Sequence, residues 1–173
     1  MTRTDELRVG LIGAGDIADW HAQAIRGAGG ARLAAVADLS RPAAEALAAR
    51  HGARAYDDVG TMLAEAGCDV VHVLTPPPAH APLALQCIEA GAHVIVEKPV
   101  ALSAGEARSI RDAAQAAGRI FAPGHNFLGL PSYLRLKSAL AAGDIGRIDT
   151  AEITWALRFA PLRSGPYGIW PLR

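Results

Sequence analysis

Short apolar runs alternate with alanine-rich amphipathic stretches from Arg8 to about Pro123, and this rhythm constrains the fold more than any other feature of the sequence. It is typical of repeated strand-helix units, which build a parallel sheet with helices on both faces. Several runs are apolar at every position, as strands covered on both faces should be. The sequence therefore predicts a doubly wound α/β fold, with strands at Arg8–Ile12, Arg32–Ala37, Ala53–Tyr56, Val70–Leu74, His93–Val96 and Arg119–Ala122.

Capping residues mark the ends of the helical stretches. A left-handed backbone conformation commonly closes a helix, and glycine adopts it without steric cost. The predicted closing glycines are Gly52, Gly67, Gly91 and Gly118. Ser103 and Glu106 have the spacing of a capping box, which satisfies free N–H groups at a helix start. They predict the beginning of the helix that ends near Gly118.

The first apolar run leads into a glycine-rich turn, Gly13-Ala14-Gly15-Asp16-Ile17-Ala18. Gly13 permits a tight turn, Gly15 lets the backbone approach a pyrophosphate, and Ala18 is small enough for close packing of helix on strand. The following helix, from Asp16 to about Ala28, directs its free N–H groups and positive dipole end at a bound anion. Glycine-rich turns also occur as plain strand-to-helix connections, but this context predicts a dinucleotide site of the Rossmann type.

Asp38 follows the second predicted strand, where a carboxylate accepts hydrogen bonds from the adenosine ribose hydroxyls and repels a 2'-phosphate. The residue therefore favours NAD over NADP as the cofactor. NADP stays possible, because Ser40 and Arg41 are placed to hold the extra phosphate if Asp38 turns away. Their alternative roles are a helix cap and a solvated surface charge.

A proline-rich loop, Thr75-Pro76-Pro77-Pro78-Ala79-His80, follows the fourth predicted strand. It leaves the carboxyl edge of the sheet, where doubly wound folds bind ligands. We expect Thr75, Pro76 and Pro77 to form a rigid wall of the cofactor site. His80 is expected to contact the cofactor or to cap the helix that begins near Pro82. The alternative is a stiff loop that only turns the chain.

Glu97-Lys98-Pro99 follows the next strand at the same edge, so Lys98 is predicted to project toward the nicotinamide. A lysine there can hydrogen-bond a substrate hydroxyl, favour its alkoxide and so ease the departure of hydride. Lys98 is thus the candidate catalytic residue, although a lysine after a strand is more often a surface residue. Glu97 is expected to orient Lys98 or to bind on the nicotinamide side.

The sequence pattern changes after Pro123, so we assign residues 1–123 to the cofactor domain and 124–173 to a second domain. A loop leads into a helix predicted from about Ser132 to Ala142. Alternating apolar residues between Thr150 and Phe159 then predict a strand of an open, antiparallel sheet. A single strand cannot be stable alone. We therefore expect residues 124–173 to be the start of an incomplete, mainly antiparallel α+β domain, and the chain to be part of a larger protein.

Bulk composition narrows the classes of partner. With 17 basic and 17 acidic residues the net charge is zero, which gives no general attraction to nucleic acid or to a membrane surface. The sequence has no secretory signal and no bilayer-length apolar run, so we expect a cytoplasmic protein. Cys68 and Cys87 are expected to be reduced thiols. The six histidines show no zinc-like spacing, and no metal is expected.

Together these residues resemble the glucose-fructose oxidoreductase, inositol dehydrogenase and rhizopine-catabolism (Gfo/Idh/MocA) family. The resemblance also includes the loop around Asn126 and the Gly143-Asp144-Ile145-Gly146 turn. It implies a second, mainly antiparallel sheet domain that holds substrate and mediates homo-oligomer formation. It implies Lys98 in the active site and cofactor contacts that include Gly13, Gly15, Asp16, Ile17, Asp38, Thr75, Pro76, Glu97 and Asn126.

The leading functional hypothesis is the cofactor-binding part of an NAD(P)-dependent oxidoreductase, which transfers hydride to or from a sugar, polyol or related substrate. Family members usually carry a further acidic residue and histidine in the sheet domain, which are not found in this sequence. A non-catalytic NAD(P)-binding sensor is therefore the alternative. A third reading is that the strand predicted up to Phe159 serves chiefly as a subunit interface.

Overall fold

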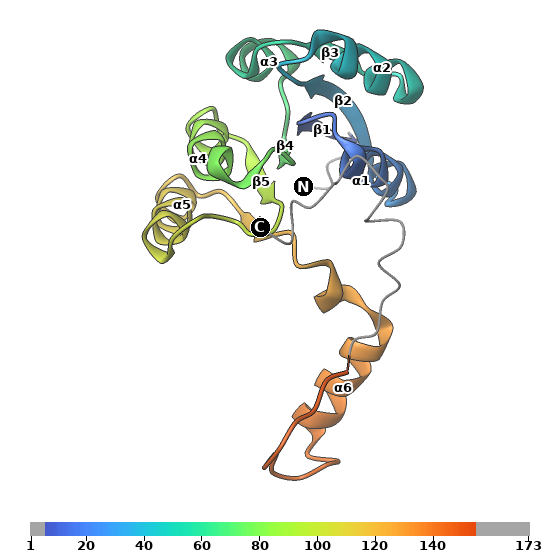
Figure 1. The fold of residues 1–173 in the computed structure, drawn as a ribbon, viewed down its shortest axis with the longest axis vertical. Coiled ribbons are helices and arrows are strands. Elements are labelled where there is room, and N and C mark those ends of the chain that lie inside the picture. The colour runs from blue at the N-terminus through green and yellow to red at the C-terminus, as the bar shows by residue number, and fades with distance from the viewer. Residues whose placement is uncertain (1–5, 155–173) are drawn as a thin grey trace. The chain divides into compact units, whose positions relative to one another are not determined.

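The computed structural model describes residues 6–154. In this range it contains a six-stranded parallel sheet with the order β3-β2-β1-β4-β5-β6 (Figure 1). The strands are β1 (Leu7–Ile12), β2 (Ala31–Ala37), β3 (Arg54–Tyr56), β4 (Val70–Val73), β5 (His93–Val96) and β6 (Phe121–Pro123). The doubly wound α/β prediction is confirmed, and each strand end lies within two residues of its predicted position.

Helices connect successive strands, as a parallel sheet requires. They are α1 (Asp16–Gly27), α2 (Arg41–His51), α3 (Val59–Ala66), α4 (His80–Glu89) and α5 (Ala104–Ala116), with a short 3-10 helix η1 (Pro77–Ala79) before α4. A second 3-10 helix η2 (Asn126–Gly129) and helix α6 (Pro131–Ala142) follow β6.

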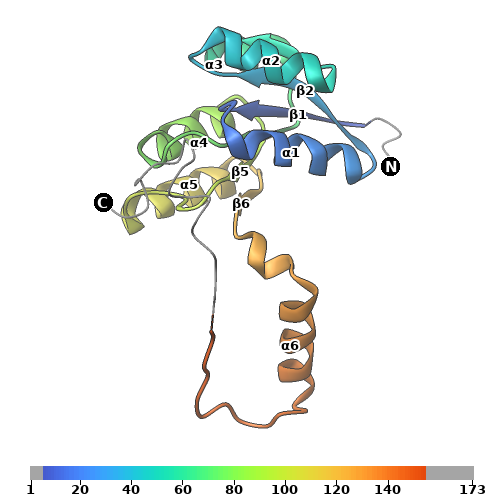
Figure 2. The same ribbon diagram turned by 45° about the vertical axis from the view of Figure 1, so that its right-hand side comes forward.

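Two hydrophobic cores cover the two faces of the sheet. On one face, apolar residues of α1 and α2, such as Ala22 and Leu47, pack on Val9 and Leu11 of β1. Figure 2 shows α1 running beside β1. On the other face, α3, α4 and α5 pack on the sheet, and Ile110 of α5 is completely buried. The strands are covered on both sides, which explains their continuous apolar sequences.

The predicted helix boundaries agree with the backbone. All four predicted closing glycines have positive φ angles, from 56° at Gly67 to 88° at Gly91. Ser103 Oγ accepts a 3.1 Å hydrogen bond from the N–H of Glu106. Glu106 Oε2 accepts the return bond from the N–H of Leu102 at 2.8 Å, so the reciprocal bond ends one residue before the capping serine.

The contacts divide the chain into two units, Met1–Phe127 and Leu128–Arg173. Helix α6 belongs to the second unit and agrees with the helix predicted from Ser132 to Ala142. The predicted domain boundary at Pro123 stays a prediction. The strand predicted between Thr150 and Phe159 is wrong for residues 150–154, which are irregular, and its remainder lies outside the described residues. Beyond β6 the described residues contain no strand with which the predicted one could pair.

Candidate functional site

The parallel sheet brings the glycine turn, the proline loop and Lys98 to one edge. β1, β4 and β5 are neighbours, and their carboxyl ends lead into Gly13, Leu74 and Glu97. Backbone bonds extend this register into the loops, from the N–H of Leu74 to Ile12 O at 2.8 Å and from the N–H of Glu97 to Val73 O at 3.0 Å. Two strand spacings, roughly 10 Å, therefore separate the glycine turn from the start of the lysine loop.

The two glycines of the turn have different roles in the backbone. Gly13 has a φ angle of +100°, and an added Cβ would lie 3.0 Å from the carbonyl carbon and oxygen of Leu74. A side chain is excluded there by the packing of β1 against β4. Gly15 has a φ angle of −73°, and an added Cβ would meet nothing within 4 Å. The protein itself thus gives no steric reason for glycine at Gly15, which leaves open space above the first turn of α1.

Asp38 connects this turn to the end of β2. Its Oδ2 atom accepts a 2.7 Å hydrogen bond from the N–H of Ala14, and Oδ1 accepts one of the same length from the N–H of Ser40. A carboxylate has about four acceptor positions, so capacity remains for hydroxyl donors from a ligand. The side chain is therefore held in place while it stays able to bind a ribose.

A cavity of about 530 Å³ lies beside these residues. It brings together five of the predicted cofactor contacts: Gly13, Gly15, Asp38, Thr75 and Pro76. Leu39, Val59 and Leu83 add an apolar wall suited to a flat aromatic ring. Thr75 Oγ1 is buried and has no hydrogen-bond partner within the described residues. An orphaned hydroxyl beside an open cavity fits a polar ligand, and the residues present therefore fit a dinucleotide.

Arg41 forms ion pairs with two carboxylates. Its Nε atom lies 2.9 Å from Glu45 Oε1, and its Nη1 atom lies 3.1 Å from Oδ2 of Asp57, a residue that lines the cavity. The hydrogen bonds to Glu45 and Asp57 raise the pKa of the Arg41 guanidinium. Sequence reasoning missed Asp57, because nothing in the pattern indicates that the loop after β3 borders the cavity.

The other predicted contacts do not line this cavity: Asp16, Ile17, Pro77, His80, Glu97, Lys98 and Asn126. Asp16 and Ile17 begin α1, while Asn126 begins η2. Glu97 Oε2 accepts a 3.0 Å hydrogen bond from the N–H of Lys98 and lies 4.0 Å from Lys98 Nζ. The Lys98 side chain is 62% exposed and that of Glu97 only 15%. Lys98 is thus free to meet a ligand, with a carboxylate at its base.

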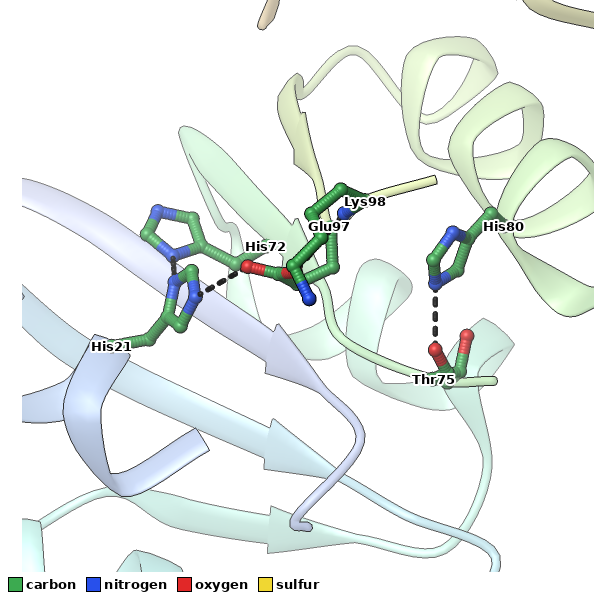
Figure 3. A network of polar contacts seen from close by, with 6 residues as sticks. All are labelled: His21, His72, Thr75, His80, Glu97 and Lys98. Atoms are coloured by element: carbon green, nitrogen blue, oxygen red, sulfur yellow. Dashed lines mark hydrogen bonds and ion pairs between the residues drawn. The ribbon is translucent and has the colours of Figure 1, made fainter. Parts of the chain in front are cut away.

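His80 joins the proline loop to the lysine loop. His80 is 1% exposed, and its Nε2 atom lies 2.6 Å from Thr75 O (Figure 3). Its Nδ1 atom lies 2.7 Å from Pro99 O. Both partners are carbonyl oxygens, which only accept hydrogen bonds. A neutral imidazole carries one N–H and donates to one of these oxygens at a time. Both ring nitrogens face the protein backbone, so His80 supports the two loops of the site rather than presenting its nitrogens to the cavity.

Two histidines meet near Glu97, although the sequence showed only scattered histidines. The Nδ1 atoms of His21 on α1 and His72 on β4 lie 2.9 Å apart, and His21 Nε2 lies 3.4 Å from Glu97 Oε1 (Figure 3). Burial, aided by the nearby His21, lowers the pKa of His72 to about 4. The available signal was a histidine inside the otherwise apolar run Val70–Leu74.

The described residues hold no group of three or more His, Cys, Asp or Glu side chains placed to bind a metal ion. In the same part of the chain, no helix has the length and apolar character needed to cross a membrane. Cys68 and Cys87 are free. Burial raises the pKa of the Cys87 thiol to about 12, and it also raises that of Cys68, so neither has the character of a reactive thiolate.

Residues 7–125 match the model of an oxidoreductase family with an NAD-binding Rossmann fold. An inositol 2-dehydrogenase of Rubrobacter xylanophilus is 34% identical over 145 residues, which are 83% of this chain and 42% of that protein. A D-glucoside 3-dehydrogenase of Escherichia coli is 35% identical over 82% of this chain and 41% of its own length. The chain therefore spans less than half the length of these relatives.

Solved structures show the same relationship. The WlbA dehydrogenase of Bordetella pertussis, in complex with NADH and UDP-GlcNAcA, has a TM-score of 0.80 and 30% identity. That match covers 86% of this chain and 43% of the WlbA chain.

Proposed function

Because this chain belongs to the Gfo/Idh/MocA oxidoreductase family, we propose that it is the cofactor-binding part of an NAD-dependent dehydrogenase. The substrate class would be a sugar, a polyol or a related hydroxyl or carbonyl compound, as the names of the inositol and D-glucoside dehydrogenases suggest. The observation that carries the proposal is the placement of the cavity and of Lys98 at one edge of the sheet, where the glycine turn and the lysine loop lie two strands apart.

The glycine turn and the cavity would hold the two ends of the adenosine diphosphate. Free N–H groups at the first turn of α1 face the open space at Gly15 and suit the pyrophosphate. Asp38 would accept hydrogen bonds from the ribose, and the apolar wall would cover the adenine. Thr75 Oγ1 would gain the partner that it lacks, beside the wall formed by Pro76 and Pro77.

Lys98 would act at the nicotinamide end, with Glu97 and Asn126. When bound, NAD supplies the ring that exchanges a hydride with the substrate carbon. The Lys98 ammonium group would hydrogen-bond the substrate oxygen and stabilise the negative charge that develops there during oxidation. Glu97, at 4.0 Å from Lys98 Nζ, would limit the directions in which that ammonium group can point. His80 would act indirectly, by fixing Thr75 and Pro99.

NAD is the proposed cofactor rather than NADP. A 2'-phosphate would meet the Asp38 carboxylate, whose Oδ1 atom already occupies the N–H of Ser40. Arg41, which the sequence suggested as a possible ligand of the NADP phosphate, forms ion pairs with Asp57 and Glu45. Two carboxylates at the cavity and a committed arginine therefore disfavour the extra phosphate.

Calorimetric titration of the 173-residue chain with NAD, NADP and ADP-ribose tests the proposal. We expect binding of NAD and ADP-ribose, and weaker binding of NADP. A folded protein that binds none of the three would overturn it. If the chain occurs within a longer protein, that protein should produce NADH on a panel of inositols and sugars. Cofactor binding without turnover on such a panel would favour the sensor alternative.

We also propose that the complete protein forms a homo-oligomer through the second domain. Sedimentation over a concentration series tests this, and a monomer at every concentration would refute it.

A further inference from the structure

The histidine pair beside Glu97 is built into the sheet. His72 is 9% exposed, and in the sheet register it lies between Leu11 of β1 and Ile95 of β5. The ring of His21 meets it edge-on, with a centroid distance of 5.1 Å and an interplanar angle of 78°. The neighbouring strand residues are apolar, so two histidines in contact at this position call for an explanation in terms of the hydrogen bonds that they make.

One arrangement of the ring hydrogens lets His21 donate to Glu97. The two facing Nδ1 atoms, 2.9 Å apart, share one hydrogen. If His72 provides it, the neutral His21 ring carries its own hydrogen on Nε2. In this arrangement His21 directs an N–H at Glu97 Oε1, and the hydrogen on His72 Nδ1 excludes the opposite tautomer of His21.

We propose that His72 and His21 are positioning residues that hold the Glu97 carboxylate and, through it, the Lys98 ammonium group at the nicotinamide end of the cofactor. Both Glu97 oxygens are engaged by the chain: Oε1 by His21 Nε2 at 3.4 Å and Oε2 by the N–H of Lys98 at 3.0 Å. The Glu97 side chain is only 15% exposed, so water can replace these donors poorly. This role rests on the proposed function.

The same contacts argue against a proton relay. His72 lies at the inner end of the series Lys98, Glu97, His21, His72 (Figure 3). A relay would have to deliver its proton to the most buried member, whose pKa is about 4. Such a group is a poor proton acceptor near neutral pH. The arrangement is therefore suited to fixing geometry.

NADH and ADP-ribose together separate this role from a general effect on the fold, because ADP-ribose lacks the nicotinamide. We expect His72→Phe to weaken NADH binding about threefold to tenfold, the loss expected from one or two hydrogen bonds. ADP-ribose affinity should stay within about twofold of the original value. His72→Asn, whose amide can reach His21 Nδ1, should restore much of the NADH affinity. Glu97→Gln should reproduce the defect.

His51→Phe is the matched control. The side chain of His51 is also only 8% exposed and contacts a carboxylate, at 2.9 Å from Asp19 Oδ1. His51 ends α2, and no polar contact to Glu97 or Lys98 is found for it among the described residues. Its substitution should leave the ratio of NADH to ADP-ribose affinities unchanged. If His72→Phe does not fold, His21→Leu carries the same test, because the His21 side chain is 18% exposed and comes from a helix rather than from the centre of the sheet.

The outcomes are distinct. Unchanged NADH affinity in a folded variant would overturn the positioning role, and so would an equal loss for NADH and ADP-ribose. Failure of the original protein to bind ADP-ribose would instead count against the proposed function. Nitrogen NMR of the imidazole rings gives an independent check, because His21 Nε2 should carry hydrogen in the original protein.

Discussion

Asp38 Oδ2 accepts a hydrogen bond of 2.7 Å from the N–H of Ala14, 24 residues earlier in the chain. The bond ties the glycine turn after β1 to the residue that follows β2. Asp38 therefore shapes the turn as well as facing the cavity. A substitution of Asp38 should consequently alter cofactor binding in two ways, through the lost ribose contact and through a less restrained turn.

We expect Asp38→Ala to lower NAD affinity roughly tenfold to a hundredfold, since hydrogen bonds to a charged group contribute about 1.5–3 kcal/mol. NADP affinity should fall much less, because the variant also loses a repulsive charge. Calorimetric titration with both cofactors measures the change. Asp112→Ala, on the exposed surface of α5, is the control. An unchanged ratio of NAD to NADP affinities would contradict the assigned role of Asp38.

Asp57 should contribute to the same selectivity through Arg41. We expect Asp57→Asn to raise NADP affinity several-fold, because it removes a charge from the cavity wall and frees the Arg41 Nη1 group. Glu45→Gln is the matched control, since it removes the other carboxylate on Arg41 without altering a residue that lines the cavity. Equal NADP affinities in the two variants would show that the loss of either ion pair, and not the charge at the cavity, determines the result.

The two glycines of the turn should separate stability from binding. Gly13→Ala should lower the free energy of unfolding by at least about 1–2 kcal/mol, because its positive φ angle and the contact with Leu74 both oppose a Cβ. Gly15→Ala should change stability by less than about 1 kcal/mol but weaken NAD binding at least tenfold, since the new methyl group enters the open space. Urea unfolding and calorimetry measure the two quantities. A stable Gly15→Ala protein with normal NAD affinity would place the pyrophosphate elsewhere.

The sheet was predictable because its strands are marked locally, by apolar runs and by glycines that end the helices. The edge at which Gly13, Thr75 and Glu97 meet also followed, since parallel strands share the direction of their carboxyl ends. The strand predicted to begin near Thr150 failed at residues 150–154 for the opposite reason. A strand depends on a partner, and alternation within one segment does not supply it.

The side-chain contacts of the site were less predictable. His21 and His72 are 51 residues apart, and their meeting depends on which face of β4 packs beside α1. His80 was expected to contact the cofactor or cap a helix, but its ring contacts carbonyl groups 5 and 19 residues away. A periodicity indicates burial. It does not indicate which polar partners a buried ring will find.

His72 should make stability depend on pH. Its pKa falls from 6.5 to about 4 on folding, so between these values the unfolded chain binds the extra proton. The free energy of unfolding should therefore rise with pH through this window. The contribution that His72 makes to it should be lost as the pH falls toward 4. The lowering of the His72 pKa from 6.5 to about 4 corresponds to about 3 kcal/mol in the free energy of unfolding.

Because His21 and Glu97 also bring ionisable side chains to this cluster, the contribution of His72 is best measured as a difference between proteins. Urea unfolding of the original protein and of His72→Asn, at several pH values from 4 to 7, gives that difference. The asparagine variant should be the less stable protein at pH 7, where it lacks the imidazole packing. Its disadvantage should shrink or reverse near pH 4, because the buried imidazole then opposes folding. Parallel curves would mean that His72 is protonated as readily in the folded chain as in the unfolded one.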